Sequence, residues 1–374
     1  MKKEIKDIMV TIIFLILIIG GCVLNILVSD KTISISERRK LKQFPEITLN
    51  KILKNNFLND LESYTADQFV GRDFYRNIKA IVNLKVLRKK DNNNYFRKDG
   101  IIYKQPGKVK ENEIKKATKK FNEIKEKYLK DNKVYFSIIP DKTYFVKDNE
   151  LRMDYKKIEE IMKINLSNMN YINIFDVLNQ NDYYKTDTHW KQENLLKVAE
   201  KLSREMTGQY ILEDFEVKTK GDFKGVYAGQ IGLKTDNVDK LNYITNQTIE
   251  NSTTFNIETN KKGKIYDEEK WNYSLDKYDY FLSGATPIIE IVKNKKENEQ
   301  ENEQKYKNNK ELIIFRDSFG SSIAPLLIEN YDKITLIDIR YIASKYLDKY
   351  IEFNNQDVLF LYSTLVLNEA SILK

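Results

Sequence analysis

Short apolar runs recur along this chain, and stretches with helical spacing separate them. The runs occupy residues 134–139, 171–175, 311–315, 334–338 and 358–362. Strands that alternate with helices, each strand a short apolar run, predict a parallel sheet with helices on both faces. We therefore expect an α/β fold in which ligands bind beyond the carboxyl ends of the strands.

The bulk composition fits one large domain or two ordinary ones. The chain has 374 residues, 41% of them hydrophobic, which suffices for a substantial core. Its net charge of +8 is spread over segments where acids and lysines intermingle, so we expect a solvated surface and no nucleic-acid partner, while an anionic cell-surface polymer is permitted. With one cysteine, Cys22, and one histidine, internal disulfides and Cys- or His-rich metal centres are excluded, and we expect no metal and no cofactor.

The N-terminus carries an almost unbroken apolar run over residues 8–28. About 20 such residues match the hydrocarbon thickness of a bilayer, so residues 1–28 are expected to be a membrane segment. Three interpretations stay open: an uncleaved signal anchor, a lipoprotein signal whose motif ends at Cys22, and a cleaved secretory peptide. Lysines and arginines lie on both flanks of the run, so the positive-inside rule does not favour an outside C-terminus.

Composition divides the rest of the chain into a stalk and a main domain. Residues 29–90 are expected to form a helical stalk with a break between two helices near residues 67–73. Residues 91–374 form the main domain, with an insertion at residues 208–278. Lys, Asn, Glu and Gln dominate residues 293–310, which predicts a disordered surface loop.

Local signals predict further elements of the main domain. The dipeptide Asp99-Gly100 is typical of a hairpin turn between two short strands. Helices are expected over residues 111–128 and 192–206, and short strands of the insertion near residues 223–227 and 242–244.

The single histidine, His189, lies in a setting that suits acyl transfer. Asp187 lies two residues before it, close enough to accept a hydrogen bond from the imidazole and fix its tautomer. Ser318 lies on a turn that follows the apolar run 311–315. A hydroxyl, a base that takes its proton and a carboxylate that orients the base are what nucleophilic acyl transfer needs. The sequence therefore predicts that Asp187, His189 and Ser318 form a triad.

These motifs, in this order and with the α/β pattern, resemble the DHHW family, SGNH-hydrolase-like proteins related to the periplasmic alginate O-acetyltransferases. The chain reads Asp187-Thr188-His189-Trp190 where the family has its name motif, so Thr188 replaces the first histidine. Aspartate and histidine precede the serine, which looks like the permuted order of the alginate acetyltransferase group. Supporting motifs lie at residues 36–39, 44–45, 67–72, 140–142, 281–284, 316–320 and 338–341.

The resemblance implies an SGNH-like three-layer domain with Ser318 as nucleophile, His189 as general base and Asp187 as its orienter. The backbone N–H of Ser318 would donate to the oxyanion of the transition state. Gly284 could bring a second N–H close, because glycine lets the backbone approach; a plain turn is the alternative.

Five further residues are candidate substrate contacts. Arg340 and Tyr341 follow a strand and could contact an acyl or sugar oxygen, and Asp141 and Lys142 follow another strand in the same way. Trp190 could stack on a sugar ring. For each of them a purely structural role stays open.

The resemblance implies a membrane-anchored acyltransferase with its catalytic domain outside the cytoplasm. It would move acetyl onto a cell-surface polysaccharide through an acyl-enzyme on Ser318, with a multi-spanning membrane O-acyltransferase as the acetyl donor. Two alternatives stay open: a carbohydrate esterase or deacetylase that uses the same triad, and a non-catalytic glycan-binding or assembly protein on a decayed hydrolase fold.

Overall fold

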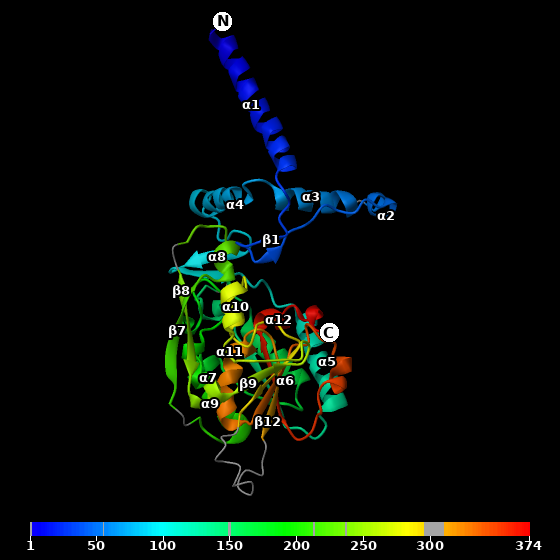
Figure 1. Ribbon diagram of the computed structural model, residues 1–374, viewed down its shortest axis with the longest axis vertical. Coiled ribbons are helices and arrows are strands. Elements are labelled where there is room, and N and C mark those ends of the chain that lie inside the picture. Colours follow the sequence, from blue (N-terminus) through cyan, green and yellow to red (C-terminus); the bar gives the residue numbers. More distant parts are fainter. Residues whose placement is uncertain (1, 55, 149–150, 212–213, 236–237, 295–309) are drawn as a thin grey trace. The chain divides into compact units, whose positions relative to one another are not determined.

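The structure divides into two compact units (Figure 1). One comprises Met1–Asn93 with Val226–Thr235, and the other comprises Asn94–Gly225 with Asp236–Lys374. The first boundary lies close to the predicted end of the stalk. The segment Val226–Thr235 was expected in the insertion of the main domain, but it groups with the first unit. The computed structural model describes residues 2–54, 56–148, 151–211, 214–235, 238–294 and 310–374.

The second unit is built on an eight-stranded sheet in the order β10-β9-β11-β13-β12-β14-β5-β6. The five strands from β13 to β6 are parallel to one another, and β11, β9 and β10 continue the sheet with antiparallel pairing. The strands are β5 (Val134–Ile139), β6 (Asn170–Tyr171), β9 (Thr253–Asn256), β10 (Lys261–Gly263), β11 (Ile288–Val292), β12 (Glu311–Arg316), β13 (Lys333–Ile337) and β14 (Asp357–Ser363).

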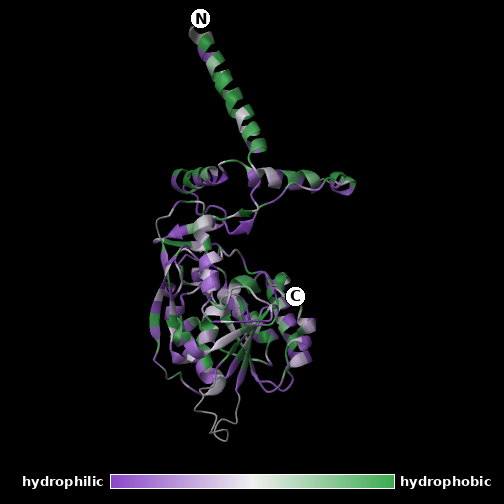
Figure 2. Cartoon of the chain, in the orientation of Figure 1, coloured by the Kyte–Doolittle hydropathy of each residue, from purple (hydrophilic) through white to green (hydrophobic). Residues whose placement is uncertain are grey.

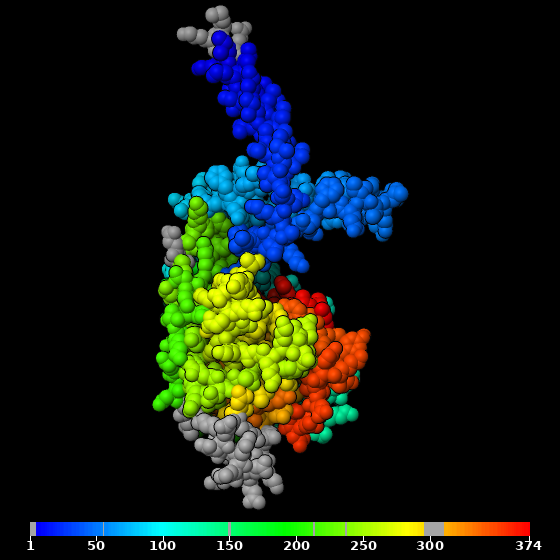
Figure 3. All heavy atoms as spheres, in the orientation of Figure 1, coloured from blue at the N-terminus to red at the C-terminus, as the bar shows by residue number. Residues whose placement is uncertain are grey.

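The predicted parallel sheet is confirmed in its centre, but one edge of it is antiparallel. The hairpin of β9 and β10 lies within the predicted insertion, yet it pairs with β11 and extends the main sheet. These edge strands are only partly buried and carry polar residues, so they lack the apolar signature of the central strands. In the space-filling view, yellow-green surface, the colour of this part of the chain, lies beside the orange-red surface of the C-terminal part (Figure 3).

Side chains on alternate positions of each central strand enter two separate cores. In β12, Leu312 and Ile314 point to one face of the sheet, and Ile313 and Phe315 point to the other. Complete burial of a side chain of this size stabilises the fold by roughly 1.5–3 kcal/mol. Helices α7 (Leu196–Thr207) and α11 (Gly320–Leu327) cover the first face, and α5 (Glu111–Tyr128) and α6 (Tyr155–Asn165) cover the second. The unit has three layers, as expected.

Several local predictions are confirmed to the residue or nearly so. Helix α5 spans the predicted 111–128, with acids in its first turn and lysines in its last, which suits the helix dipole. Strands β3 (Tyr95–Lys98) and β4 (Ile101–Lys104) form the predicted hairpin, in which Asp99 and Gly100 adopt positive φ. The helix expected over 192–206 begins as a 3-10 turn at Gln192–Asn194 before α7.

Other local predictions need correction. The run at 171–175 is a strand only at β6, because the Asn173 side chain accepts a hydrogen bond from the Phe175 N–H and a 3-10 turn begins there. The strand expected near 242–244 is confirmed as β8 (Asp239–Thr245), which pairs with β7 (Glu216–Phe223) in a separate antiparallel ribbon. The strand expected at 223–227 instead ends at Phe223, and Val226–Gln230 is helix α8. Most of the loop predicted at 293–310 lies outside the described residues.

The first unit holds α1 (Lys2–Leu27), α2 (Leu49–Leu53), α3 (Asn56–Gln68) and α4 (Arg72–Ile81). Among the described residues, Ile5–Leu27 is the one helix long and apolar enough to cross a membrane, a test that a signal sequence also passes. Figure 2 shows hydrophobic residues along most of its length. The predicted break between two stalk helices is the turn from α3 to α4.

The motifs at residues 36–39 and 67–72 come together in this unit as a network of charges. Arg39 donates two hydrogen bonds to the Asp67 carboxylate, at 2.8 and 2.5 Å. These bonds lower the pKa of Asp67 to about 2. Glu37 pairs with Arg72 and, at 3.3 Å, with Arg76. These pairs tie the segment after α1 to α3 and α4.

Candidate active site

Asp187, His189 and Ser318 form a continuous chain of hydrogen bonds. The distance from His189 Nδ1 to Asp187 Oδ1 is 2.6 Å, and the distance from His189 Nε2 to Ser318 Oγ is 2.7 Å. The Asp187 carboxylate is an acceptor, so the proton on the ring belongs on Nδ1 and Nε2 is left to accept from the Ser318 hydroxyl. The structure thus joins the three residues that the sequence singled out.

The residues before and after Ser318 fix the turn that carries it. It follows β12 and leads into α11 at Gly320. The Asp317 carboxylate accepts from the Phe319 N–H at 3.0 Å and from the Ser363 N–H at 2.8 Å. A Cβ atom at Gly320 would lie 2.6 Å from the Arg316 Cβ, so a glycine is needed for the helix to start there.

The Ser318 N–H lies at the N-terminal end of α11, where helix amides are unpaired. Within the part of the chain that the structure describes, this N–H makes no hydrogen bond to another protein group. It is therefore available to a ligand oxygen near the serine hydroxyl.

Lys142 holds the loop that carries Asp187. Its ammonium donates to the carbonyl oxygens of Tyr184 at 2.9 Å and Asp187 at 2.7 Å. Burial lowers the pKa of Lys142 to about 7, while attraction to Asp187, Asp239 and Asp141 opposes that effect. The contacts of Lys142 are internal, so it positions the loop and is not the substrate contact that was considered.

Asp141 is also used inside the fold. Its carboxylate accepts from the Tyr155 hydroxyl at 2.7 Å, from the Thr364 hydroxyl at 3.0 Å and from the Thr143 hydroxyl at 2.6 Å. The residue is buried. These bonds join the carboxyl ends of β5 and β14, and the considered role of Asp141 as a substrate contact is not supported.

A second set of contacts fixes the loop from the side of β8. The Asp239 carboxylate accepts from the Thr186 N–H at 2.8 Å and the Thr186 hydroxyl at 2.6 Å. Gly225 lies so close that a Cβ atom there would be 2.3 Å from the Asp187 Cβ. Sequence reasoning missed Asp239 and Gly225, since both act through contacts between distant segments.

The imidazole of His189 lies flat against the ring of Tyr278. The ring centroids are 3.8 Å apart and the planes differ by 6°. The Tyr278 hydroxyl is hydrogen-bonded to Ser322 Oγ at 2.7 Å, and burial raises the pKa of Tyr278 well above its ordinary value. Tyr278 is thus a neutral, fixed wall for the base. The chain has 24 tyrosines, and nothing in the sequence distinguishes Tyr278 from the others.

Trp190 lies in the core and does not present a ring to a sugar. It is fully buried, and its indole N–H donates to the Phe319 carbonyl at 3.2 Å and Ser322 Oγ at 2.9 Å. It holds the turn of Ser318 next to the loop of His189. The stacking role considered for it was wrong.

Gly284 is a turn residue. Its φ is +77°, and its N–H donates to the Phe281 carbonyl at 3.2 Å. This N–H is therefore engaged, so of the two roles considered for Gly284 the structure supports the plain turn and not the second oxyanion donor. The Gly284 carbonyl accepts from the buried Arg316 guanidinium at 3.4 Å.

Arg340 and Tyr341 lie outside the hydrogen-bonded triad. The Arg340 guanidinium donates two hydrogen bonds to the Asp338 carboxylate, at 2.9 and 2.6 Å. Tyr341 is exposed, and the Arg340 guanidinium lies 5.5 Å from its ring centroid. These contacts join Arg340 to Asp338 and Tyr341, and none of them involves a residue of the triad.

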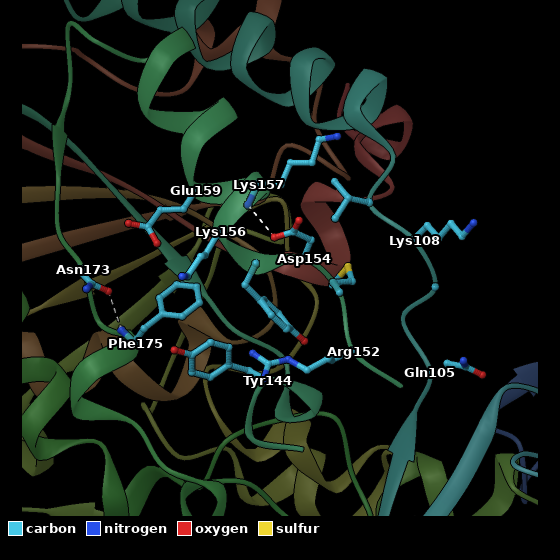
Figure 4. Close-up of a pocket in the computed structure, with 14 residues that line it drawn as sticks. Gln105, Lys108, Tyr144, Arg152, Asp154, Lys156, Lys157, Glu159, Asn173 and Phe175 are labelled. Carbon is cyan, nitrogen blue, oxygen red and sulfur yellow. Dashed lines mark hydrogen bonds between the residues drawn. The ribbon is translucent and has the colours of Figure 1, made fainter. Parts of the chain in front are cut away.

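A hollow of about 980 Å³ opens beyond the carboxyl ends of β5 and β6 (Figure 4). The Arg152 guanidinium lies over the rings of Tyr144 and Tyr155, 5.3 and 5.5 Å from their centroids. Phe175 and Lys108 also line the hollow. Tyr155 forms one wall of the hollow, and its hydroxyl donates a hydrogen bond to Asp141, which follows β5. The described part of the chain contains no group of three or more Asp, Glu, His or Cys residues arranged to hold a metal ion.

Solved structures share this fold. A DHHW family protein from Eubacterium siraeum matches with a TM-score of 0.56 and 21% identity, over 74% of this chain and 93% of that one. PatB1 from Bacillus cereus, with a sulfonyl adduct, matches with a TM-score of 0.56 and 20% identity, over 73% of this chain and 95% of that one. A second PatB1 structure matches with a TM-score of 0.51, 17% identity, and 73% and 96% coverage.

No protein-family model matches this sequence, and no curated protein matches it. The structural likeness is therefore one of fold: a mixed α/β fold with a central, mainly parallel sheet. At that level the resemblance to the DHHW family, which the motifs predicted, is confirmed.

Proposed function

We propose that this protein is an SGNH-type acyltransferase that moves acetyl onto a hydroxyl of a cell-surface polysaccharide. The observation that carries the proposal is the hydrogen-bond chain from Asp187 through His189 to Ser318, with distances of 2.6 and 2.7 Å. This is the arrangement in which a base activates a serine hydroxyl and a carboxylate orients the base. Asp187 and His189 precede Ser318 in the sequence, which is the order that the family resemblance implies.

In the first half-reaction, His189 Nε2 takes the Ser318 proton while Oγ attacks the carbonyl carbon of an acetyl ester. The Ser318 N–H donates to the oxyanion, an interaction typically worth about 3–4 kcal/mol in the transition state. The proton on His189 then passes to the departing oxygen of the donor, and the acetyl group stays on Ser318. In the second half-reaction a sugar hydroxyl gives its proton to His189 and attacks the acetyl carbonyl. The Ser318 oxygen leaves and takes the proton back.

The hollow beside Arg152 supplies the space that a polymer would need. Strands β5 and β12 are parallel, so the hollow after β5 and Ser318 after β12 lie at the same edge of the sheet. The aromatic rings of Tyr144 and Phe175 offer flat apolar surfaces, and Arg152 and Lys108 offer donors for sugar oxygens. We propose that neighbouring sugars of the acceptor bind there.

The proposed setting is the outer face of the cell membrane, with α1 as an uncleaved single-pass anchor. The length and apolar character of Ile5–Leu27 support the anchor. A multi-spanning membrane O-acyltransferase that delivers acetyl is part of the proposal, and it rests on the family resemblance. The placement outside the cytoplasm rests on the same resemblance.

A sulfonyl fluoride tests the activation of Ser318, because such reagents react with hydroxyls that a neighbouring base deprotonates. We expect a sulfonyl adduct on Ser318 in the full chain, and none in Ser318→Ala or His189→Ala. The buried neighbour Ser321 provides a matched control, since Ser321→Ala leaves the triad intact. Equal labelling of wild type and Ser318→Ala would refute a reactive serine at this site. Acetyl released mainly to water in the presence of glycans would favour an esterase.

A further inference from the structure

Helix α4 in the first unit exposes its apolar side. Phe74 is 64% exposed and Ile78 is 41% exposed, and Tyr75, Ile81 and Val82 are exposed too. A spacing of three and four residues places these side chains along one face of the helix. Figure 2 shows that α4 carries both hydrophobic and hydrophilic residues.

The polar side of α4 faces the body of its own unit. Arg76 donates to the Gly229 carbonyl at 2.9 Å, and Asn77 donates to the Gly232 carbonyl at 3.0 Å. Ala80 is buried on this side, and a Cβ atom at Gly232 would lie 3.5 Å from the Ala80 Cβ. The usual amphipathic arrangement is therefore reversed, because the apolar stripe of a helix normally faces the core.

The exposed face continues into the turn before α4. Phe69 is exposed, and its ring lies edge-on to Tyr75 with centroids 5.4 Å apart. Tyr75 in turn contacts Phe74, with centroids 5.5 Å apart. We call Phe69, Phe74, Tyr75, Ile78, Ile81 and Val82 the outer face of α4. A contiguous exposed apolar patch of this kind marks an interaction surface.

This face begins where the candidate membrane span ends. The Asn25 side chain, in the last turn of α1, accepts a hydrogen bond from the Val70 N–H at 2.8 Å. The same side chain donates to the Gly21 carbonyl inside α1 at 2.7 Å. The turn that holds Phe69 is thus fixed to the end of α1. If Ile5–Leu27 crosses a bilayer, Phe69 and the start of α4 are at the depth of the lipid headgroups.

We infer that the outer face of α4 lies in the interfacial layer of the membrane, as a second contact beside the span. Helices of this type lie in the plane of the interface with the apolar side among the acyl chains. The basic residues Lys85, Arg88 and Lys89 lie in the eight residues after the end of α4 and suit anionic headgroups. The contact would fix the orientation of the first unit on the membrane surface. It does not depend on the acyl-transfer chemistry.

Spin labels on the full chain in bilayers test this directly. Cys22→Ser removes the single cysteine, and Phe74→Cys or Ile78→Cys then carries the label. Ile164→Cys is the matched control, because Ile164 is an exposed apolar residue, 75% accessible, on α6 of the other unit. The bilayers contain phosphatidylethanolamine and phosphatidylglycerol. Collisions with oxygen, which enters lipid, are compared with collisions with a water-soluble nickel chelate.

We expect the ratio of oxygen to nickel collisions at positions 74 and 78 to exceed that at position 164 by several-fold. An aqueous ratio at positions 74 and 78, equal to that at position 164, would overturn the inference. Protection of positions 74 and 78 from both reagents would overturn it as well, because protein would then cover the face. As a check without substitutions, a photoreactive lipid should crosslink the unmodified chain at residues 72–82. Crosslinks confined to α1 would contradict the inference.

Discussion

The Tyr278 ring and the His189 imidazole are stacked in parallel, with centroids 3.8 Å apart. An aromatic contact of this kind is worth about 0.5–1.5 kcal/mol beyond the area it buries. The proposed base is thus held by Asp187 at one ring nitrogen and by Tyr278 on its face.

Removing the ring should impair catalysis more than removing the hydroxyl. We expect Tyr278→Leu to lower kcat roughly 10-fold, because the imidazole gains freedom to leave the serine. Tyr278→Phe keeps the stack and loses only the bond to Ser322, so its kcat should stay within about threefold of wild type. Ester hydrolysis or acetyl transfer measures both. Equal losses in the two variants would show that the hydroxyl, and not the stack, matters.

Lys142 should make the stability of the protein depend on pH. Burial lowers its pKa from 10.5 to about 7 in the folded state, so between these values the unfolded chain binds a proton that the folded chain lacks. Unfolding then takes up a proton, and stability from this group rises as pH increases from about 7 to 10.5, with a slope of up to about 1.4 kcal/mol per pH unit.

Chemical denaturation of wild type and Lys142→Met across that range isolates the contribution of this one side chain. The free energy of unfolding of wild type, minus that of the variant, should increase as pH rises. A difference between the two proteins that is constant with pH would rule out a depressed pKa at Lys142.

Thr188 stands where the family name has its first histidine, and the contacts of the triad do not use it. We expect Thr188→His to change activity by no more than about threefold, whereas His189→Ala should cost about 10³-fold or more. A large gain in rate for Thr188→His would mean that a second imidazole takes part in the chemistry and that this chain is an impaired member of its group.

Arg152 should matter for polymers and not for small esters. We expect Arg152→Ala to raise KM for a polysaccharide acceptor roughly fivefold, since the hydrogen bond that its guanidinium would donate to a sugar oxygen contributes about 1 kcal/mol. Hydrolysis of a small acetyl ester should stay unchanged. Lys156→Ala, at the same hollow, removes a charge without removing the ring contacts and serves as the control. An equal effect on both substrates would place the hollow outside the acceptor path.

The elements and residues that depend on local sequence could be predicted, whereas those that depend on packing between distant segments could not. The predicted strand 134–139 has the same bounds as β5, because all six of its residues are apolar enough or small enough to be buried. Asp187 and His189 were found because they are two residues apart and the chain has no other histidine. Tyr278 meets His189 only through folding, and it resembles many other tyrosines in the sequence.

Three of the candidate substrate contacts have a structural role for one physical reason. Lys142, Asp141 and Trp190 carry groups that suit a ligand, but each is buried and bonded to the backbone or side chains that hold the triad in place. A sequence motif alone does not separate a residue that touches substrate from one that positions its neighbour. The antiparallel edge of the sheet was missed because β9 and β10 are short and polar.

The most direct test of the account is the detection of an acetyl group on Ser318. The full chain is incubated with an acetyl ester donor, stopped in acid, digested and analysed by mass spectrometry. Wild type should carry an acetyl adduct on the peptide that contains Ser318, and addition of an acceptor glycan should discharge it, while Ser318→Ala carries none and Ser321→Ala resembles wild type. Acetyl transfer by wild type and Ser318→Ala at the same rate, with no adduct on this peptide, would contradict the account.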